Sequence, residues 1–327
     1  MAHNIPAEKG KFFNRILTPP VEISRVREVS RVSELYMKEK IWVAITAHKP
    51  LSRLNSLVNV LNEYLRYPFD LDVKIYIDYE SQDDVEILNS LLEPYKKLRP
   101  EIVVAEPGYE NWYLTWAHKT DLALQVLNKK ADFYIYQEND MLITLENFLY
   151  WHKWRRVLGK RGLEPGFIRY ELLNGLKIPF DNYYKYSLTK ETPNVWYDIG
   201  FTVPKILVVA HDVDFFVQVA NPYYGAMILN QEDGDKYIRS ESFDPNLSFQ
   251  KVGVRNWPLA DRSSMGLAFE EPPDGLEHRR CVPVVKENGV YVPHSAGLLR
   301  HDDTKYAPDL ALKHSDLLDC SRMFTIA

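Results

Sequence analysis

The chain has 327 residues, of which 46% are hydrophobic, 13% aromatic and 26% charged, so it is long enough to bury a substantial core. Its formal net charge of −5 argues against a nucleic-acid partner, because such partners normally require a basic surface. No run of about 18 apolar residues occurs, so we expect no transmembrane segment.

The cysteine content and the N-terminus bear on the compartment. Cys281 and Cys320 are too few for a disulfide scaffold and lack the spacing of metal ligands. The N-terminus has no apolar core of the kind found in signal peptides. We therefore expect a reducing compartment, the cytoplasm. The sequence makes no prediction of the oligomeric state.

The first half of the chain alternates strand-like and helix-like patterns. Residues 1–40 are polar and mixed in charge, and we interpret them as an N-terminal arm with a short helix through Val29 to Tyr36. Beyond them, we expect strands at 41–47, 73–77 and 102–105 and from Phe133, with helices at about 51–65, 83–98 and 112–127. This order predicts a Rossmann-related α/β fold with a central, mostly parallel sheet covered by helices on both faces.

The second half has a different pattern. A helix rich in aromatic residues (Phe148, Trp151, Trp154) precedes short strands at 167–172, 205–210 and 215–220, and residues 245–293 are dense in proline and glycine. We expect a mixed α+β half with antiparallel pieces, in which His211 to Asp214 form a turn. The predicted organisation is one domain over 41–327, divided into 41–145, 146–300 and a C-terminal tail at 301–327.

Polar residues follow three of the predicted strands. They are Thr46 to His48, Asp78, and Glu138 to Asp140. The carboxyl ends of parallel strands share one edge of a sheet, where ligands bind in open α/β folds. Carboxylates at the end of a buried strand are costly unless they are used, and such hard oxygen donors suit Mg²⁺ or Mn²⁺. The alternative is a solvated acidic turn.

The plan of the chain resembles that of the GT-A fold glycosyltransferases over roughly residues 41–300. Residues 134–141, Y-I-Y-Q-E-N-D-M, resemble the DxD metal-binding segment of this superfamily, with Glu138 in place of the first aspartate. The resemblance implies that Asp140 binds the metal and that Glu138 contacts the metal or the ribose. It also implies that Thr46, His48, Asp78 and Asn139 lie at the nucleotide. Arg53 and Lys119 are cations on the helices near this edge and are candidates for phosphate contacts, and the alternative for both is a solvated surface position. The alternative for Asp78 is a structural cap.

Residues 221–239, N-P-Y-Y-G-A-M-I-L-N-Q-E-D-G-D-K-Y-I-R, resemble a pattern of inverting members. The resemblance implies an acceptor segment at Tyr224 to Ala226, a catalytic base at Asp233 or Glu232, and a downstream cation at Arg239. Asp235 is equally acidic, and the alternative for the whole cluster is a turn around Gly234.

Residues 291–297, Y-V-P-H-S-A-G, resemble the segment that carries a late metal-binding histidine in some members. The resemblance implies His294 as a third metal ligand, with His301 as its rival. An imidazole ligand favours Mn²⁺ over Mg²⁺.

The resulting hypothesis is a metal-dependent, inverting glycosyltransferase. It would move a sugar from a nucleotide-sugar donor, UDP-linked by preference, to a hydroxyl of a glycan or another acceptor. Two alternatives remain open. One is a metal-dependent hydrolase or nucleotidyltransferase that uses His48, His211, Asp212 and the 138–140 cluster, and the other is a binding module without turnover.

Overall fold

The computed structural model describes residues 39–78, 82–179, 185–187, 196–198, 205–209, 215–218, 222–250, 257–287, 290–302 and 323–326. The expected N-terminal arm, including its helix from Val29 to Tyr36, lies outside these residues except for positions 39 and 40. The ordered α/β region begins at Lys40, one residue before the predicted first strand.

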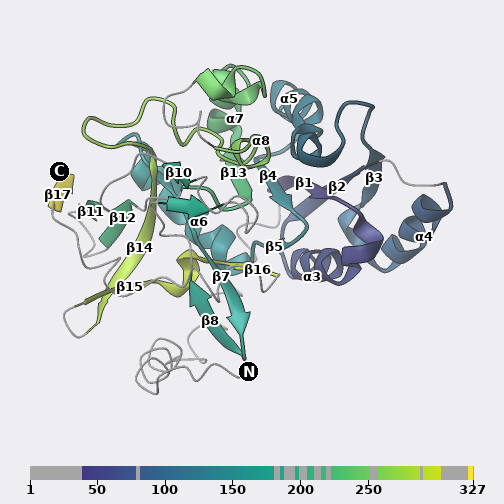
Figure 1. Cartoon of the computed structure of the whole chain (residues 1–327), viewed down its shortest axis with the longest axis horizontal. Helices are drawn as coiled ribbons and strands as arrows, with labels where there is room; N and C mark the ends of the chain where they lie inside the picture. The colour runs from purple at the N-terminus through teal and green to yellow at the C-terminus, as the bar shows by residue number, and fades with distance from the viewer. Residues whose placement is uncertain are drawn as a thin grey trace.

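A five-stranded sheet forms the centre of the first half, and its strand order is β13-β4-β1-β2-β3 (Figure 1). The strands are β1 (Lys40–Ala47), β2 (Asp70–Ile77), β3 (Glu101–Val104), β4 (Phe133–Glu138) and β13 (Ala226–Asn230). The first four are mutually parallel, whereas β13 runs antiparallel to β4. The expected Rossmann-related α/β architecture with a mostly parallel sheet is confirmed.

Helices cover both faces of this sheet. In Figure 1, α3 (Leu54–Tyr64) and α4 (Gln82–Leu92) lie below it, and α5 (Lys119–Leu127) and α7 (Gln231–Tyr237) lie above it. Short 3-10 turns extend three of the predicted helices: η1 (Pro50–Arg53), η2 (Glu93–Leu98) and η3 (Asn111–Trp116). Pro94 explains the break after α4, because proline lacks the N–H that would continue the helix.

The apolar run of β1 is explained by burial on both faces. Ile41, Val43 and Ile45 pack into the core beneath the sheet, whereas Trp42 and Ala44 pack into the core above it. Successive side chains of a strand point to opposite faces, so a strand covered on both sides needs apolar residues throughout. This arrangement leaves only the strand ends for polar function.

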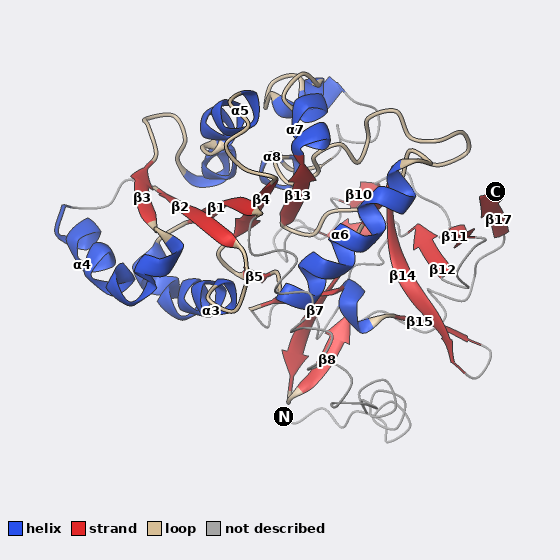
Figure 2. Ribbon diagram, turned by 180° about the vertical axis from the view of Figure 1, so that it is seen from behind, coloured by secondary structure: helices blue, strands red, loops and turns tan. Residues whose placement is uncertain are grey.

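The second half is mixed, as expected. After α6 (Leu145–Gly159), one sheet has the order β5-β16-β7-β8, with β5 (Met141–Leu142), β16 (Leu298–His301), β7 (Ile168–Leu173) and β8 (Leu176–Pro179) (Figure 2). Another has the order β15-β14-β12-β11-β17, with β15 (Val290–Pro293), β14 (Arg280–Glu287), β12 (Phe215–Gln218), β11 (Lys205–Val209) and β17 (Met323–Ile326). The remaining elements are β6 (Glu164–Pro165), β9 (Lys185–Ser187), β10 (Trp196–Asp198), η4 (Glu241–Phe243), η5 (Ser248–Gln250), α8 (Leu259–Arg262) and η6 (Ser295–Gly297).

Two details refine the expected organisation. β11 and β12 pair antiparallel, as a hairpin requires, although the turn from His211 to Asp214 lies outside the described residues. Within the expected tail, residues 323–326 form β17, which pairs in parallel with β11. Among the residues described, no helix is both long and apolar enough to cross a membrane.

Candidate functional site

The strand register brings the predicted polar residues to one edge of the central sheet. Thr46 of β1 pairs with Glu138 of β4, and the neighbouring Ala47 pairs with Ile77 of β2. Thr46, His48, Asp78 and the Glu138–Asp140 segment therefore meet at the carboxyl ends of three adjacent strands. We call this place the acidic edge. It confirms the edge expected from parallel strands.

Asp140 has two cationic partners at this edge. Arg53 of η1 donates to its Oδ2 at 3.2 Å, and Nε2 of His301 lies 3.7 Å from the same oxygen. Burial alone would raise the pKa of Asp140, but His301 and Arg53 outweigh it and the pKa is lowered. Its other oxygen, Oδ1, is buried and has no hydrogen-bond partner among the described residues. Asp140 thus presents one unused anionic oxygen.

Of the two histidines expected as the third metal ligand, His301 rather than His294 lies beside Asp140. Antiparallel pairing of β16 with β5 places His301 opposite Met141, the residue after Asp140. Its Nδ1 also lies 2.9 Å from Oε1 of the fully buried Glu171. Burial lowers the pKa of His301, but its bonds to Asp140 and Glu171 raise it to about 9. The ring is therefore an imidazolium at neutral pH.

His294 requires a correction, since the sequence favoured it as the third metal ligand. Its exposed side chain accepts from the N–H of Ala296 at the start of η6, and its own N–H donates to Pro283 of β14. Six residues lie between it and His301, and of these two histidines only His301 pairs with the strand that follows Asp140.

Glu138 faces the second half of the chain. Its Oε1 accepts from the Tyr223 hydroxyl at 2.8 Å, and its N–H donates to the carbonyl of Gly225 at 3.1 Å. Burial and the nearby Asp140 raise the pKa of Glu138 to about 8, although the bond from Tyr223 opposes the shift. Glu138 and Asp140 thus disfavour being ionised together at one strand end, and a bound cation would favour the ionised form of Glu138.

Thr46 and Asn139 lie at the edge but turn into the protein. The N–H of Asn139 donates to the carbonyl of Thr46 at 3.0 Å, and the Thr46 hydroxyl lies 3.2 Å from the Tyr136 hydroxyl. Both side chains are buried, and Nδ2 of Asn139 has no acceptor among the described residues. Thr46 therefore stabilises the acidic edge through buried hydrogen bonds, whereas the side-chain amide of Asn139 has an N–H donor that remains unused.

His48 and Asp78 form the end of the acidic edge at β2. Their side chains make a short hydrogen bond between Nδ1 of His48 and Oδ2 of Asp78. The N–H of Lys49 also donates to Oδ1 of Asp78 at 3.3 Å, and Lys49 adopts a left-handed conformation (φ 49°). His48 is exposed and Asp78 is half-buried, so this pair is accessible to a ligand.

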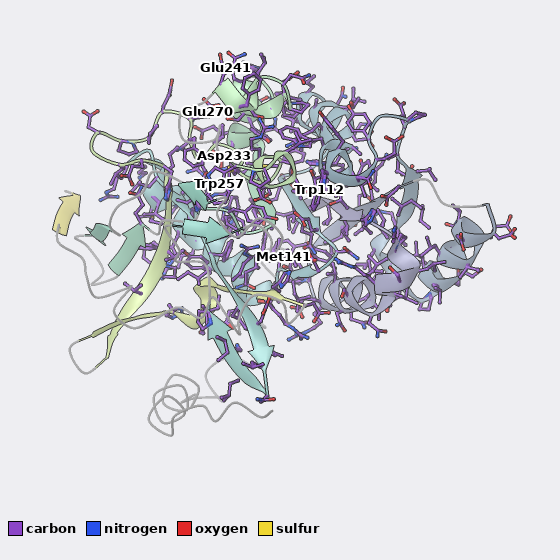
Figure 3. All side chains as sticks on the ribbon, viewed as in Figure 1. Trp112, Met141, Asp233, Glu241, Trp257 and Glu270 are labelled. Atoms are coloured by element: carbon purple, nitrogen blue, oxygen red, sulfur yellow. The ribbon has the colours of Figure 1, made fainter. Side chains whose placement is uncertain are left out.

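The structure does not bring Asp233 and Glu232 to the acidic edge, which corrects their assignment as the base. β13 runs antiparallel to β4, so Ala226 pairs with Gln137 near the edge while Asn230 pairs with Phe133 at the far end. The four residue steps from Ala226 to Asn230 span about 14 Å. Asn230 caps α7, which starts there and carries both acids (Figure 3 labels Asp233).

Both acids also have structural partners. Asp233 is buried and pairs with the buried Arg155 through both of its carboxylate oxygens. Glu232 is exposed and pairs with Lys236. Asp235 and the predicted downstream cation Arg239 also pair with each other away from the acidic edge, with Oδ1 and Nη2 4.0 Å apart.

Of the two cations expected near phosphates, only Arg53 lies at the acidic edge. Lys119 is buried above the sheet, where its Nζ donates to the Tyr237 hydroxyl and to the carbonyl of Ser263. Burial lowers the pKa of Lys119 well below its usual value. Lys119 therefore connects α5 to the segments that carry Tyr237 and Ser263, and it does not lie at the acidic edge.

Sequence reasoning missed four residues that surround the acidic edge: Arg169, Glu171, Tyr223 and Asp261. Arg169 lies over the Tyr223 ring at 4.6 Å and influences both Glu138 and His301 electrostatically. The sequence at 168–171, I-R-Y-E, could have indicated two of them. Apolar or aromatic and charged residues alternate there within a predicted strand, so Arg169 and Glu171 lie on the same face of it. Buried charges of this kind require partners.

The donors at the acidic edge fit a divalent cation that receives further ligands from a substrate. Among the described residues, no three histidine, cysteine, aspartate or glutamate side chains form a metal-binding group. The unused Oδ1 of Asp140 and the nearby carboxyl of Glu138 are nevertheless the hard donors that Mg²⁺ and Mn²⁺ select, and such ions often need few protein ligands beside phosphates.

Comparisons with known proteins give distant similarities. No family model and no curated protein matches the chain. The apo form of the glycosyltransferase GlyE from Streptococcus pneumoniae aligns at 9% identity over 74% of this chain and 45% of its own, with a TM-score of 0.36. A CMP:2-keto-3-deoxy-manno-octonic acid synthetase complexed with CTP aligns at 12% identity over 66% of this chain and 86% of its own, with a TM-score of 0.34.

S. aureus TarS (residues 1–349) aligns at 13% identity over 60% of this chain and 48% of its own, with a TM-score of 0.27. The chain thus spans less than half the length of the two glycosyltransferase structures. At these identities and TM-scores the similarities carry no argument on function.

Proposed function

We propose that the protein is a glycosyltransferase that moves a sugar from a nucleotide-sugar donor, UDP-linked by preference, to a hydroxyl of a glycan or another acceptor. The observation that carries the proposal is the acidic edge itself. Groups suited to a nucleoside (His48, Asp78) and groups suited to a diphosphate-bound cation (Glu138, Asp140) meet there at adjacent strand ends.

The end at β2 would bind the nucleoside. The Asp78 carboxylate accepts hydrogen bonds, and the donors that a pyrimidine ring N–H or ribose hydroxyls present are complementary to it. His48 and Lys49 hold this carboxylate in place before a ligand arrives. A preorganised acceptor of this kind loses little side-chain entropy on binding.

The end at β4 would bind the diphosphate. Asp140 and Glu138 would hold Mn²⁺ or Mg²⁺, and a bound cation of this kind neutralises the negative charge that develops on a departing diphosphate. Arg53, half-exposed beside Asp140, would contact the phosphate oxygens directly. The imidazolium of His301 adds a second positive charge behind Asp140.

Donor turnover tests the proposal. The protein is incubated with UDP-, GDP- and CMP-sugars with and without Mn²⁺, and the released products are identified. We expect release of nucleoside diphosphate from one UDP-sugar in Mn²⁺, and stabilisation of the fold by about 2.7 kcal/mol when that donor is present at 100 times its Kd.

Other products would contradict the proposal in distinct ways. Pyrophosphate formed from a nucleoside triphosphate and a sugar acid or sugar phosphate would assign the acidic edge to a nucleotidyltransferase. Stabilisation by a nucleotide sugar without any product over a range of acceptors would assign it to a binding module.

A further inference from the structure

Strand β7 carries two buried charged residues close to the acidic edge. In its sheet, β7 lies beside β16, and β16 lies beside β5, the strand that follows Asp140 (Figure 1). Arg169 and Glu171 are two residues apart on β7, so their side chains point to the same face of it. Both are buried. A buried charge is costly unless it is paired, so these two side chains require an explanation.

Glu171 is connected to Asp140 through His301. Oε1 of the fully buried Glu171 lies 2.9 Å from Nδ1 of His301, and the other ring nitrogen, Nε2, lies 3.7 Å from Oδ2 of Asp140. A hydrogen bond at one nitrogen of a histidine fixes the orientation of the ring and the state of the other nitrogen. Glu171 therefore determines which atom of His301 faces Asp140.

The same end of β16 also holds the backbone of Asp140. The N–H of Asp302 donates to the Asp140 carbonyl at 2.7 Å, and the Asp302 carboxylate accepts from Nδ2 of Asn59 on α3 at 2.8 Å. Asp140 is thus held at its backbone by Asp302 and at Oδ2 by His301. This leaves Oδ1, which has no hydrogen-bond partner among the described residues, in a defined position.

Arg169 is connected to Glu138 in a similar way, through Tyr223. The Arg169 guanidinium lies 4.6 Å from the centre of the Tyr223 ring, and the Tyr223 hydroxyl donates to Oε1 of Glu138 at 2.8 Å. A guanidinium over the face of an aromatic ring attracts it and so restricts its position. Arg169 and Glu171 therefore each lie one side chain behind an acid of the acidic edge.

We propose that Glu171 and Arg169 are positioning residues for the cation that the acidic edge would bind. Each holds one acid of that edge through one intervening side chain. This inference rests on the proposed function. Residues behind the groups that touch a metal ion orient those groups, and their loss typically weakens metal binding by about 10- to 100-fold. The proposal also accounts for two buried charges on β7, where well-packed apolar residues would often be at least as stable.

Binding of Mn²⁺ alone, measured from the electron paramagnetic resonance signal of the free ion, tests the proposal without turnover. Glu171→Met removes the acceptor at similar volume, and we expect it to raise the Kd for Mn²⁺ by about 10- to 100-fold. Glu171→Gln keeps an acceptor oxygen and should regain most of that loss. Arg169→Met should weaken Mn²⁺ binding as well. Glu63→Gln is the matched control, because Glu63 is also buried and accepts from the N–H of Leu145, but lies near the end of α3.

Double variants show whether each residue acts through its neighbour. In the His301→Gln background, Glu171→Met should leave the Kd for Mn²⁺ unchanged, because the connection to Asp140 is already broken. In the Tyr223→Phe background, Arg169→Met should likewise have no further effect. The same loss of affinity with and without the intervening side chain would overturn the proposal.

The single variants can also overturn it. A wild-type Kd for Mn²⁺ in Glu171→Met or Arg169→Met would remove the assignment of that residue. Equal losses in Glu171→Met and Glu171→Gln, or in Glu171→Met and Glu63→Gln, would show that the loss does not come from orienting His301.

NMR of wild-type protein with ¹⁵N-labelled histidine keeps the proposal testable if Glu171→Met does not fold. A slowly exchanging Nδ1–H proton that is absent in His301→Gln is expected, and its absence from the wild type would overturn the role of Glu171. Donor turnover in Mn²⁺ by a wild type whose Kd matches that of Glu171→Met would remove the inference alone. A wild type without Mn²⁺ binding and without donor turnover would remove the proposed function and the inference together.

Discussion

Asp78 is held by His48 and by the backbone of Lys49, so its carboxylate is positioned before any ligand binds. We predict that Asp78→Ala raises KM for the donor and weakens binding of free UDP, with little change in kcat. Contacts to the nucleoside are equally strong in the ground state and the transition state, so their loss affects binding alone. A variant with unchanged KM and a melting temperature several degrees lower would instead make Asp78 a structural residue.

His301 predicts a pH dependence of stability. Its folded pKa of about 9 lies above the ordinary value near 6.5, so the folded state binds more protons between these values. The free energy of unfolding should therefore fall as pH rises from about 6.5 to 9, by at most about 1.4 kcal/mol per pH unit from this group.

Chemical denaturation in EDTA at several pH values measures this dependence. In His301→Gln the free energy of unfolding should fall less between pH 6.5 and 9 than in the wild type, because the contribution of His301 is absent. Parallel pH curves for the two proteins would show that the imidazolium contributes nothing to stability.

Among the elements, α7 is attached to α6 by the Arg155–Asp233 pair, in which both side chains are buried. We predict that Asp233→Asn lowers the free energy of unfolding by about 3 kcal/mol or more, because it leaves a buried guanidinium without its counter-charge. Transfer activity per folded molecule should remain near wild type, since α7 begins at the far end of β4.

Glu232→Gln is the matched control, because Glu232 is exposed and its pair with Lys236 is worth under about 0.5 kcal/mol. A large loss of kcat in Asp233→Asn without loss of stability would restore Asp233 as a candidate base.

The turn before β13 depends on a glycine. Gly225 has φ 61°, and a Cβ added there would come within 2.8 Å of Cγ of the buried Met141. Gly175 has φ 77° but open space around it. Gly225→Ala should therefore be more destabilising than Gly175→Ala by about 1–3 kcal/mol, the usual cost of overpacking. Equal losses in urea denaturation would mean that only the backbone conformation matters at both positions.

Across the whole molecule, the features that follow from local pattern could be predicted from the sequence. The β-α alternation predicted a parallel sheet covered on both faces and placed Thr46, Asp78 and Asp140 at one edge of it. These predictions required only the period of the apolar residues and the shared direction of parallel strands.

Features that depend on long-range pairing could not be predicted in the same way. The apolar pattern of β13 does not reveal the direction in which the strand runs. Because β13 pairs antiparallel with β4, Asp233 lies at the end of the sheet opposite the acidic edge. Likewise, only the pairing of β16 with β5 distinguishes His301 from His294.

The central claim is that the acidic edge binds a nucleotide sugar through a divalent cation held by Asp140. Titration calorimetry of UDP into the wild-type protein and Asp140→Asn, each in Mn²⁺ and in EDTA, tests it most directly. We predict that wild-type binding requires Mn²⁺ and that Asp140→Asn weakens it by at least about tenfold, since the loss of a paired charge costs about 2–5 kcal/mol. Equal UDP affinity in both proteins, or equal affinity in Mn²⁺ and in EDTA, would contradict the claim.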